Sequence, residues 1–170
     1  MAGTTTNNGW TYPTSTDLVT NGASAIQTLA TGIDTSTGKG LIASQSWSPV
    51  LSSGWLNGNG TWNADYFKLG KMVFFAATFT IGSTTTKGTG LIMSLPVTAT
   101  GNSASLYWGL ATIGGVGYQL VTARTTTTTL SLQALDASAT YLKRTGVTSA
   151  IPATWATGDS FTVQGMYEAA

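Results

Sequence analysis

The acidic side chains are the groups of this chain best suited to acid–base chemistry. Glycoside hydrolysis needs two carboxylates across one sugar bond, yet no spacing in the sequence singles out a pair. Asp159, between Gly158 and Ser160, is predicted to be a turn residue, and Asp65 with Lys68 is expected to solvate a strand edge. The sequence therefore predicts no catalytic residue and a protein that is not an enzyme. The six acids are Asp17, Asp34, Asp65, Asp136, Asp159 and Glu168.

Metal and phosphate chemistry find equally little support in the sequence. The chain has no cysteine and no histidine, which excludes disulfides, zinc sites and histidine general bases. No group of acids has calcium-loop spacing. The "GGVG" stretch at 114–117 is followed by "YQLVTA", a strand pattern, so it predicts a hairpin turn rather than a phosphate loop. We expect no metal and no cofactor.

Composition excludes two further classes of partner. Charged residues make up 8% of the chain and the formal net charge is +1, with no basic run, so nucleic-acid binding is not expected. No apolar stretch approaches the roughly 18 residues of a membrane helix, and no signal peptide is visible at the N-terminus. The surface must consist largely of Thr, Ser, Asn, Gly and Ala.

Aromatic residues are the remaining candidates for ligand recognition. Tyrosine and tryptophan offer rigid contact area that stacks on sugar rings, although a tryptophan in a β-sandwich usually lies in the core. Tyr107 and Trp108 are adjacent, so in a strand one of them must face away from the core. The candidate ligand residues, near predicted strand ends or turns, are Tyr107, Trp108, Tyr118, Arg124 and Tyr141.

From Trp47 onward, alternating runs separated by turn signals predict an antiparallel β-sandwich or jelly-roll-like domain over residues 46–170. The segment 125–129 is read as an exposed hairpin tip or edge strand. The predicted strands are 46–51, 62–69, 72–81, 90–95, 105–113, 118–123, 129–135, 140–143 and 161–168.

The hairpin within "YFKLGKMVFFAATFTIG" (66–82) is apolar on both faces. A two-residue turn at Gly70-Lys71 places Leu69 opposite Met72 and Phe67 opposite Phe74. The opposite face carries Val73, Phe75, Ala77, Phe79 and Ile81. One face belongs in the domain core, so the other needs a cover near the turn, and such apolar patches mark interfaces.

The N-terminal third carries a different pattern. Residues 1–16 read as a polar extended segment, either a tail or a peptide anchored to a partner by Trp10, Tyr12 and Pro13. Residues 17–33 form a short helix with an apolar stripe, and residues 34–45 a Gly/Ser/Thr linker. So short a helix is marginal alone and must pack on its own domain or on other copies. Val19, Ile26 and Ile33 occupy heptad a positions and Leu29 a d position, a pattern that favours two strands in long coiled coils.

Three stretches resemble small tail or minor structural proteins of bacteriophages, those of actinobacterial phages in particular. "TYPTSTDLVTNGASAIQTLATGID" (11–34) is similar to their N-terminal segment. "YFKLGKMVFFAATFTIG" with "GTGLIMSLP" (88–96) resembles the hairpin core of trimeric fibre head domains, and "WATGDSFTVQGMYEAA" (155–170) their closing strand. The stretches cover under half of the chain, and their motifs are structural.

The resemblance implies a homotrimeric appendage of the virion, on the tail or the capsid. The N-terminal segment would attach to other virion proteins, the helix would join a three-helix bundle, and the β domain would lie at the distal end. The outward aromatic side chains and the nearly uncharged surface add the hypothesis that the β domain contacts a host cell-surface glycan. An alternative is a capsid-attached fibre or decoration protein with a purely structural role, and a carbohydrate-active enzyme is a third hypothesis. The expected oligomer interface comprises Val19, Ile26, Leu29, Ile33, Phe67, Leu69, Met72 and Phe74.

Overall fold

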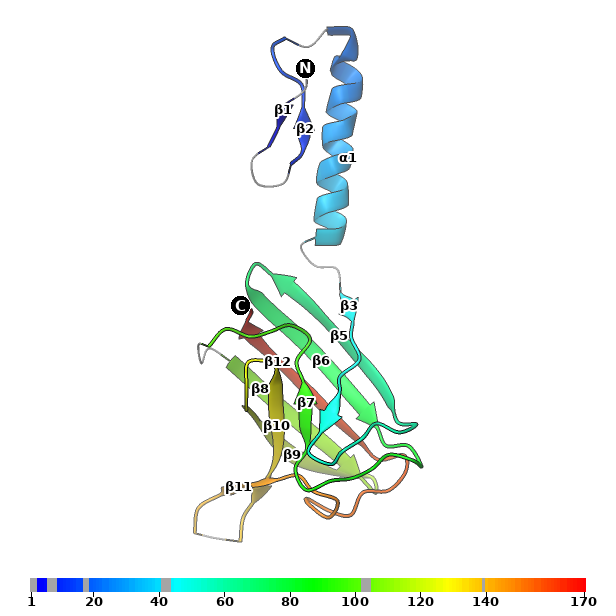
Figure 1. Ribbon diagram of the computed structural model, residues 1–170, viewed down its shortest axis with the longest axis vertical. Coiled ribbons are helices and arrows are strands. Elements are labelled where there is room, and N and C mark those ends of the chain that lie inside the picture. Colours follow the sequence, from blue (N-terminus) through cyan, green and yellow to red (C-terminus); the bar gives the residue numbers. More distant parts are fainter. Residues whose placement is uncertain (1–2, 6–8, 17–18, 41–43, 102–104, 139) are drawn as a thin grey trace. The chain divides into compact units, whose positions relative to one another are not determined.

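The computed structural model of the protein describes residues 3–5, 9–16, 19–40, 44–101, 105–138 and 140–170 (Figure 1). The chain divides into two compact units, Met1–Ala43 and Ser44–Ala170. None of the helices described combines the length and the apolar character needed to cross a membrane.

The N-terminal unit pairs a small hairpin with one helix. Its elements are β1 (Gly3–Thr4), β2 (Thr11–Tyr12), the 3₁₀ turn η1 (Val19–Asn21) and α1 (Gly22–Gly40). β1 and β2 are antiparallel, and the Thr5 backbone N–H donates to the Trp10 carbonyl at 2.9 Å. The N-terminal segment is therefore not simply extended, because part of it closes into a hairpin.

The helix is longer than the sequence predicted. It begins at Gly22 instead of Asp17 and ends at Gly40 instead of Ile33. The predicted linker over 34–45 is therefore wrong for residues 34–40. Glycine and threonine lower helix propensity by only about 1 kcal/mol or less each, and without proline nothing blocks propagation from the turns already formed.

One side of α1 faces the hairpin of the same unit. The half-buried helix positions recur at helical spacing, and a methyl group added at Gly32 would lie 3.5 Å from the Trp10 indole. Leu29 belongs to this half-buried side. Over residues 22–33, the part of the helix whose burial the structure describes, the half-buried positions are Gly22, Ala25, Leu29 and Gly32.

The C-terminal unit is mainly β, as predicted, and consists of one antiparallel sheet curled into a sandwich-like domain. The strand order is β3-β5-β6-β12-β8-β9-β10-β7-β4, with β11 paired to β10. The strands are β3 (Gln45–Ser46), β4 (Leu51–Ser52), β5 (Thr61–Leu69), β6 (Met72–Thr80), β7 (Ile92–Ser94), β8 (Ser105–Ile113), β9 (Val116–Arg124), β10 (Thr129–Asp136), β11 (Lys143–Gly146) and β12 (Ser160–Glu168).

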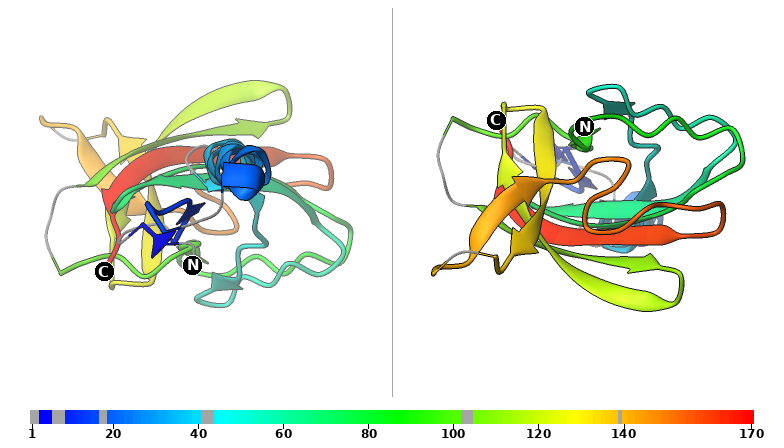
Figure 2. Two further views of the ribbon diagram at one scale, coloured as in Figure 1. Left: turned by 90° about the horizontal axis from the view of Figure 1, so that it is seen from above. Right: turned by 90° about the horizontal axis from the view of Figure 1, so that it is seen from below.

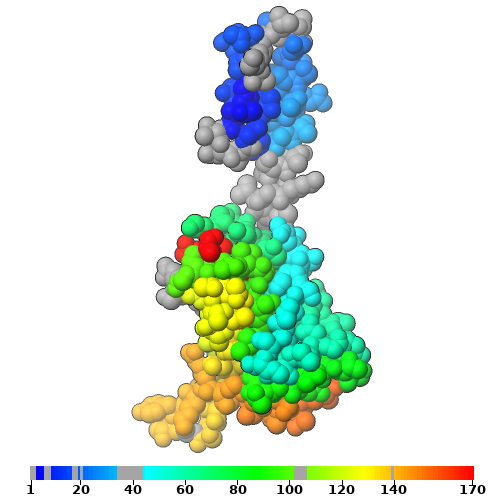
Figure 3. All heavy atoms as spheres, viewed as in Figure 1, coloured from blue at the N-terminus to red at the C-terminus, as the bar shows by residue number. Residues whose placement is uncertain are grey.

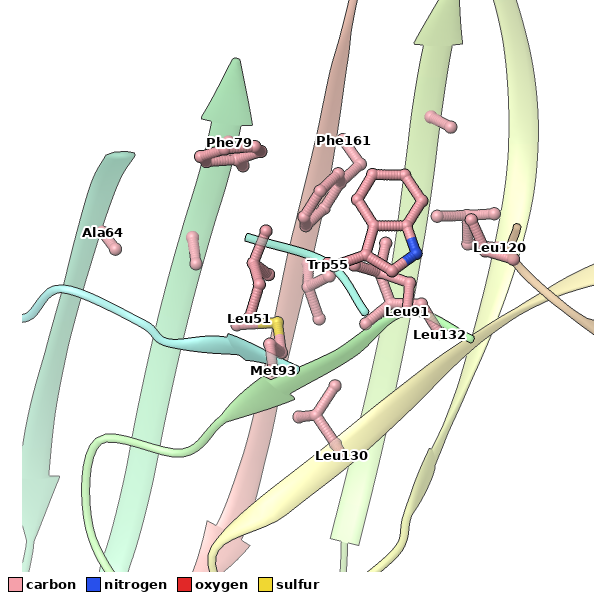
Figure 4. Packing of buried hydrophobic residues seen from close by; sticks show 14 of the residues in the cluster. Leu51, Trp55, Ala64, Phe79, Leu91, Met93, Leu120, Leu130, Leu132 and Phe161 are labelled. Atoms are coloured by element: carbon pink, nitrogen blue, oxygen red, sulfur yellow. The ribbon is translucent and has the colours of Figure 1, made fainter. Parts of the chain in front are cut away.

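The curl creates two layers around the core. β10, β7 and β4 turn back over one face of the layer made by β5, β6, β12, β8 and β9, and Figure 2 shows the twist between these strands. In Figure 3 the chain around β4 and β7, cyan to green, closes over this face. Figure 4 shows Leu51, Met93 and Leu130 of the covering strands in one buried cluster with Phe79 and Phe161 of the larger layer. The other face of the larger layer is called the outer face below.

Two strand predictions need correction. The run 46–51 is not one strand: β3 pairs with β5 and β4 pairs with β7, with Pro49 between them. Proline lacks the N–H that a continuous ladder would need. The predicted strand 140–143 begins only at Lys143, because its register with β10 starts at the Lys143–Asp136 pair.

The hairpin registers are as predicted. Leu69 pairs with Met72 and Phe67 with Phe74, across a turn in which Gly70 has φ +61°. Gly114 and Gly115, both with positive φ, form the turn between β8 and β9, so "GGVG" is a hairpin turn. The threonine run 125–128 is the tip between β9 and β10.

The hydroxyl of Tyr167 joins β12 to the chain after β7. This fully buried side chain donates to the Val97 carbonyl at 2.7 Å and accepts from the Val97 N–H at 3.1 Å. Burial raises the pKa of the Tyr167 hydroxyl well above its ordinary value. The phenol is therefore a neutral structural group of the core.

Replacing Tyr167 with phenylalanine is expected to lower the free energy of unfolding by about 1–3 kcal/mol, because both polar groups of Val97 lose their partner. In the native protein stability should also fall as pH rises above about 10, since the unfolded tyrosine ionises there and the folded one does not. The Tyr167→Phe variant should lack that component. Urea unfolding from pH 8 to pH 11 measures both effects.

Tyr141→Phe is the matched control for the loss of stability at neutral pH, since Tyr141 is 82% exposed and outside the core. An equal loss of stability in the two variants would contradict the role given to the Tyr167 hydroxyl.

Candidate functional site

The outer face of the larger β layer is apolar in a restricted area. Strand alternation places Phe67 and Phe74 on this face, beside Met166 in the same cross-strand row. The next row contains Asp65, Ala76, Gln164 and Trp108. In the row beyond, β5, β6 and β12 carry the polar residues Asn63, Thr78 and Thr162, and β8 carries the exposed Leu110. On β5, β6 and β12 the apolar area therefore lies toward the β5–β6 turn.

This area is hollowed into a depression that we call the outer-face slot. Its volume is about 470 Å3, and its floor lies at Ala76, the small residue of its row. The side chains along the slot are Phe67, Phe74, Trp108 and Met166, with Asp65, Gln164 and Ser44 as its polar groups.

Packing explains why the slot has firm walls. Phe67 and Phe74 are a directly opposed strand pair whose rings stack with centroids 4.9 Å apart and planes 9° from parallel. Trp108 is 50% exposed and lies two strands away from Ala76, on β8. A methyl floor between large aromatic groups leaves a recess that the sheet itself cannot fill.

The charged side chains at the strand positions of the outer face are all negative. These positions include two carboxylates, Asp65 and Glu168, and no lysine or arginine. The face therefore favours neutral or cationic groups over anionic ones.

A second uncovered apolar surface, called the helix ridge, belongs to the N-terminal unit. It consists of Val19, Ile26 and Ile33, which are 96%, 62% and 39% exposed. Their seven-residue spacing places them along one line of the helical segment. Of the helix positions predicted for the interface, Leu29 alone belongs to the half-buried side.

The hairpin part of the predicted interface is uncovered to different degrees. Leu69 is 51% exposed at the turn, whereas Met72, Phe67 and Phe74 are half-buried. Phe67 and Phe74 also form a wall of the outer-face slot. They are therefore available either to another copy of the chain or to a ligand in the slot.

The structure does not bring the five predicted ligand residues together. Tyr107 lies on the inner face, 5.9 Å from Phe75 by ring centroids, and Tyr118 also packs against the core. The Arg124 guanidinium donates to the Thr100 carbonyl at 2.8 Å. Tyr141 lies in the exposed connection between β10 and β11. Trp108 is the member of this set that lines the slot.

Trp10, Tyr12 and Pro13, predicted for attachment, lie in or next to β2. Trp10 faces Gly32 of the helix, and Tyr12 is 39% exposed. The indole of Trp10 thus already has a packing role within its own unit.

Two of the carboxylates have hydrogen-bond partners within turns and loops. Asp159 accepts backbone N–H groups from Ala156 at 2.6 Å and from Gly114 at 2.9 Å, which fits its predicted turn role. Hydrogen bonds from the Ser138 side chain and backbone lower the pKa of Asp136. No three acids of the described residues gather in a way that could hold a metal ion.

Sequence reasoning missed the polar members of the slot. Gln164 and Ser44 carry no motif, and Asp65 was read only as solvating a strand edge. The one usable signal was the outward aromatic side chain in the Tyr107-Trp108 pair. Comparisons of the chain with protein-family models, with curated proteins and with solved structures give no significant match.

Proposed function

We propose that the protein is a structural component of a bacteriophage virion, assembled as a homotrimeric appendage whose β domain contacts the host surface. The observation that carries the proposal is the presence of two uncovered apolar surfaces on one nearly uncharged chain. These are the helix ridge and the turn end of the β5–β6 hairpin, where Leu69 is 51% exposed. Soluble monomers rarely expose such groups in clusters.

The phage assignment and the number three come from the sequence resemblance described above. The N-terminal unit attaches to other virion proteins, on the tail or the capsid, and Tyr12 is its exposed aromatic group. The helix ridges of three copies meet in a bundle. Few charges oppose that association, because the chain carries a formal net charge of +1.

A second candidate is a capsid-attached decoration protein with a purely structural role. The scatter of Tyr107, Tyr118, Arg124 and Tyr141 over the β domain favours it, since a receptor site would gather such groups. Both candidates share the oligomer and the virion location, and they differ in whether the β domain binds a host ligand.

Light scattering on the purified full chain tests the assembly. We expect a mass three times that of the 17.5 kDa chain at micromolar concentration. A monomer would overturn the proposal. Gold-labelled antibody on intact particles, viewed by electron microscopy, then tests the location, and absence of label from tail and capsid would refute it.

A further inference from the structure

We propose that the outer-face slot binds a neutral oligosaccharide, with Trp108 as the stacking platform. This inference deepens the proposed function, on which it rests, by naming the site and the chemical class of the host ligand. The slot volume of about 470 Å3 falls within the usual ~300–1,000 Å3 range of small-molecule sites.

Trp108 supplies the surface on which a sugar ring stacks. The residue is 50% exposed although it stands in the middle of a strand with partners on both sides. The core aromatics Trp55 and Trp155 are by contrast almost fully buried and pair edge to face at 5.8 Å. The exposed apolar face of Trp108 can cover the C–H side of a pyranose ring without any rearrangement of the core.

The polar groups of the slot suit hydroxyl groups. Within the described part of the chain, neither the Asp65 carboxylate nor the Gln164 amide has a side-chain hydrogen-bond partner. A carboxylate accepts from adjacent hydroxyls, and an amide both donates and accepts. Gln164 stands directly beside Trp108 in the β12–β8 pairing.

The order of the strands sets the length of the ligand. Asp65 on β5 and Trp108 on β8 are separated by β6 and β12. Three strand spacings of ~4.8 Å place the two positions about 14 Å apart. A single pyranose ring cannot reach both, so two or three linked rings are needed to use the stacking platform and the carboxylate together.

Charge decides between neutral and anionic saccharides. The strand positions of the outer face include Asp65 and Glu168 and no cation, so a carboxylated or phosphorylated sugar would meet like charge. A neutral chain gains hydrogen bonds at the slot without that repulsion.

The test uses the full-length protein and a panel of neutral trisaccharides (maltotriose, cellotriose and triacetylchitotriose) with 3′-sialyllactose as the anionic comparison. Saturation-transfer NMR and titration should show millimolar binding of at least one neutral trisaccharide, weaker binding of its monosaccharide, and none of the sialylated probe. Trp108→Ala should weaken binding by about tenfold or more, the loss of roughly 1.4 kcal/mol.

Leu110→Ala is the matched control. Leu110 is 48% exposed on the same strand and the same face, but it does not line the slot. Its replacement should leave binding within about twofold of the native value. Asp65→Asn should weaken the trisaccharide more than the monosaccharide, because only the longer ligand reaches that carboxylate.

Three results would overturn the inference: no binding of any neutral probe, binding that Trp108→Ala leaves unchanged, or a changed oligomer mass in the Trp108→Ala variant. The last result would mean that another copy of the chain covers the slot. If the protein is a trimer that binds no saccharide, only the proposed saccharide site in the outer-face slot is refuted. If it is a monomer that binds saccharide, only the proposed homotrimeric appendage is refuted.

Discussion

Replacing Asp159 with alanine is expected to lower the free energy of unfolding of the β domain by about 2–4 kcal/mol, with a fall in melting temperature on the order of 10 °C. Asp159 is 8% exposed, and its carboxylate accepts from the Ala156 N–H at 2.6 Å and the Gly114 N–H at 2.9 Å. One oxygen closes the turn before β12, and the other holds the turn between β8 and β9. Alanine leaves both donors without their charged acceptor.

Asp159→Asn is expected to lose about half as much stability, since its carboxamide keeps one acceptor oxygen and places an amide group against the second N–H. Asp136→Ala is the control at a similar turn, where the carboxylate accepts from the Ser138 N–H at 2.9 Å in an exposed loop. Its loss should be much smaller, because water replaces the bond. If Asp159→Ala and Asp136→Ala lowered the melting temperature equally, that result would contradict the role of Asp159 in joining the two turns.

Local signals explain why most strands could be predicted from sequence. The β8 bounds, Ser105–Ile113, and the register of Phe67 with Phe74 both follow from alternation next to a glycine turn. The alternation of apolar and polar side chains can be read from neighbouring residues in the sequence. Gly70 and Gly114 mark the turns where the backbone needs a positive φ.

Long-range pairing could not be predicted in the same way. β12 inserts between β6 and β8, and its Val163 pairs with Ala77 far away in sequence. No residue in either strand identifies that partner. The outer-face slot depends on this insertion, since it brings Gln164 and Met166 between Ala76 and Trp108. A small residue such as Ala76 becomes the floor of a recess only once its cross-strand neighbours are known.

The helix shows how composition can mislead about where an element ends. Glycine, serine and threonine in 34–40 suggested a linker, although backbone propagation carries α1 to Gly40. Part of the apolar stripe predicted within residues 17–33 lies on the half-buried side of the helix, at Gly22, Ala25 and Leu29, whereas Ile26 and Ile33 are exposed. The sequence alone could not show which side of the helix its own unit would cover. In the structure the Trp10 indole packs beside Gly32, so the side that carries Gly32 is the covered one.

Changing Ile26 to aspartate is expected to abolish the proposed trimer while leaving both units folded. Ile26 is 62% exposed within the described chain, so a carboxylate there costs little in an isolated subunit. In a bundle the same position would bury three carboxylates in one apolar seam, at a cost of at least about 2 kcal/mol per chain. Leu29→Asp would confuse the result, because Leu29 is half-buried on the hairpin side of the helix.

Gln27→Asp is the matched control, since it places the same charge on an exposed position one residue along the helix and off the ridge. Light scattering should give one chain for Ile26→Asp and three for Gln27→Asp, with unchanged melting of the β domain in both. A trimer that survives Ile26→Asp would show that the helix ridge is not the interface between copies. The turn end of the β5–β6 hairpin, at Leu69 and Met72, would then have to hold the copies together. Dissociation of both variants would show that charge anywhere on α1, and not burial of the ridge, controls assembly.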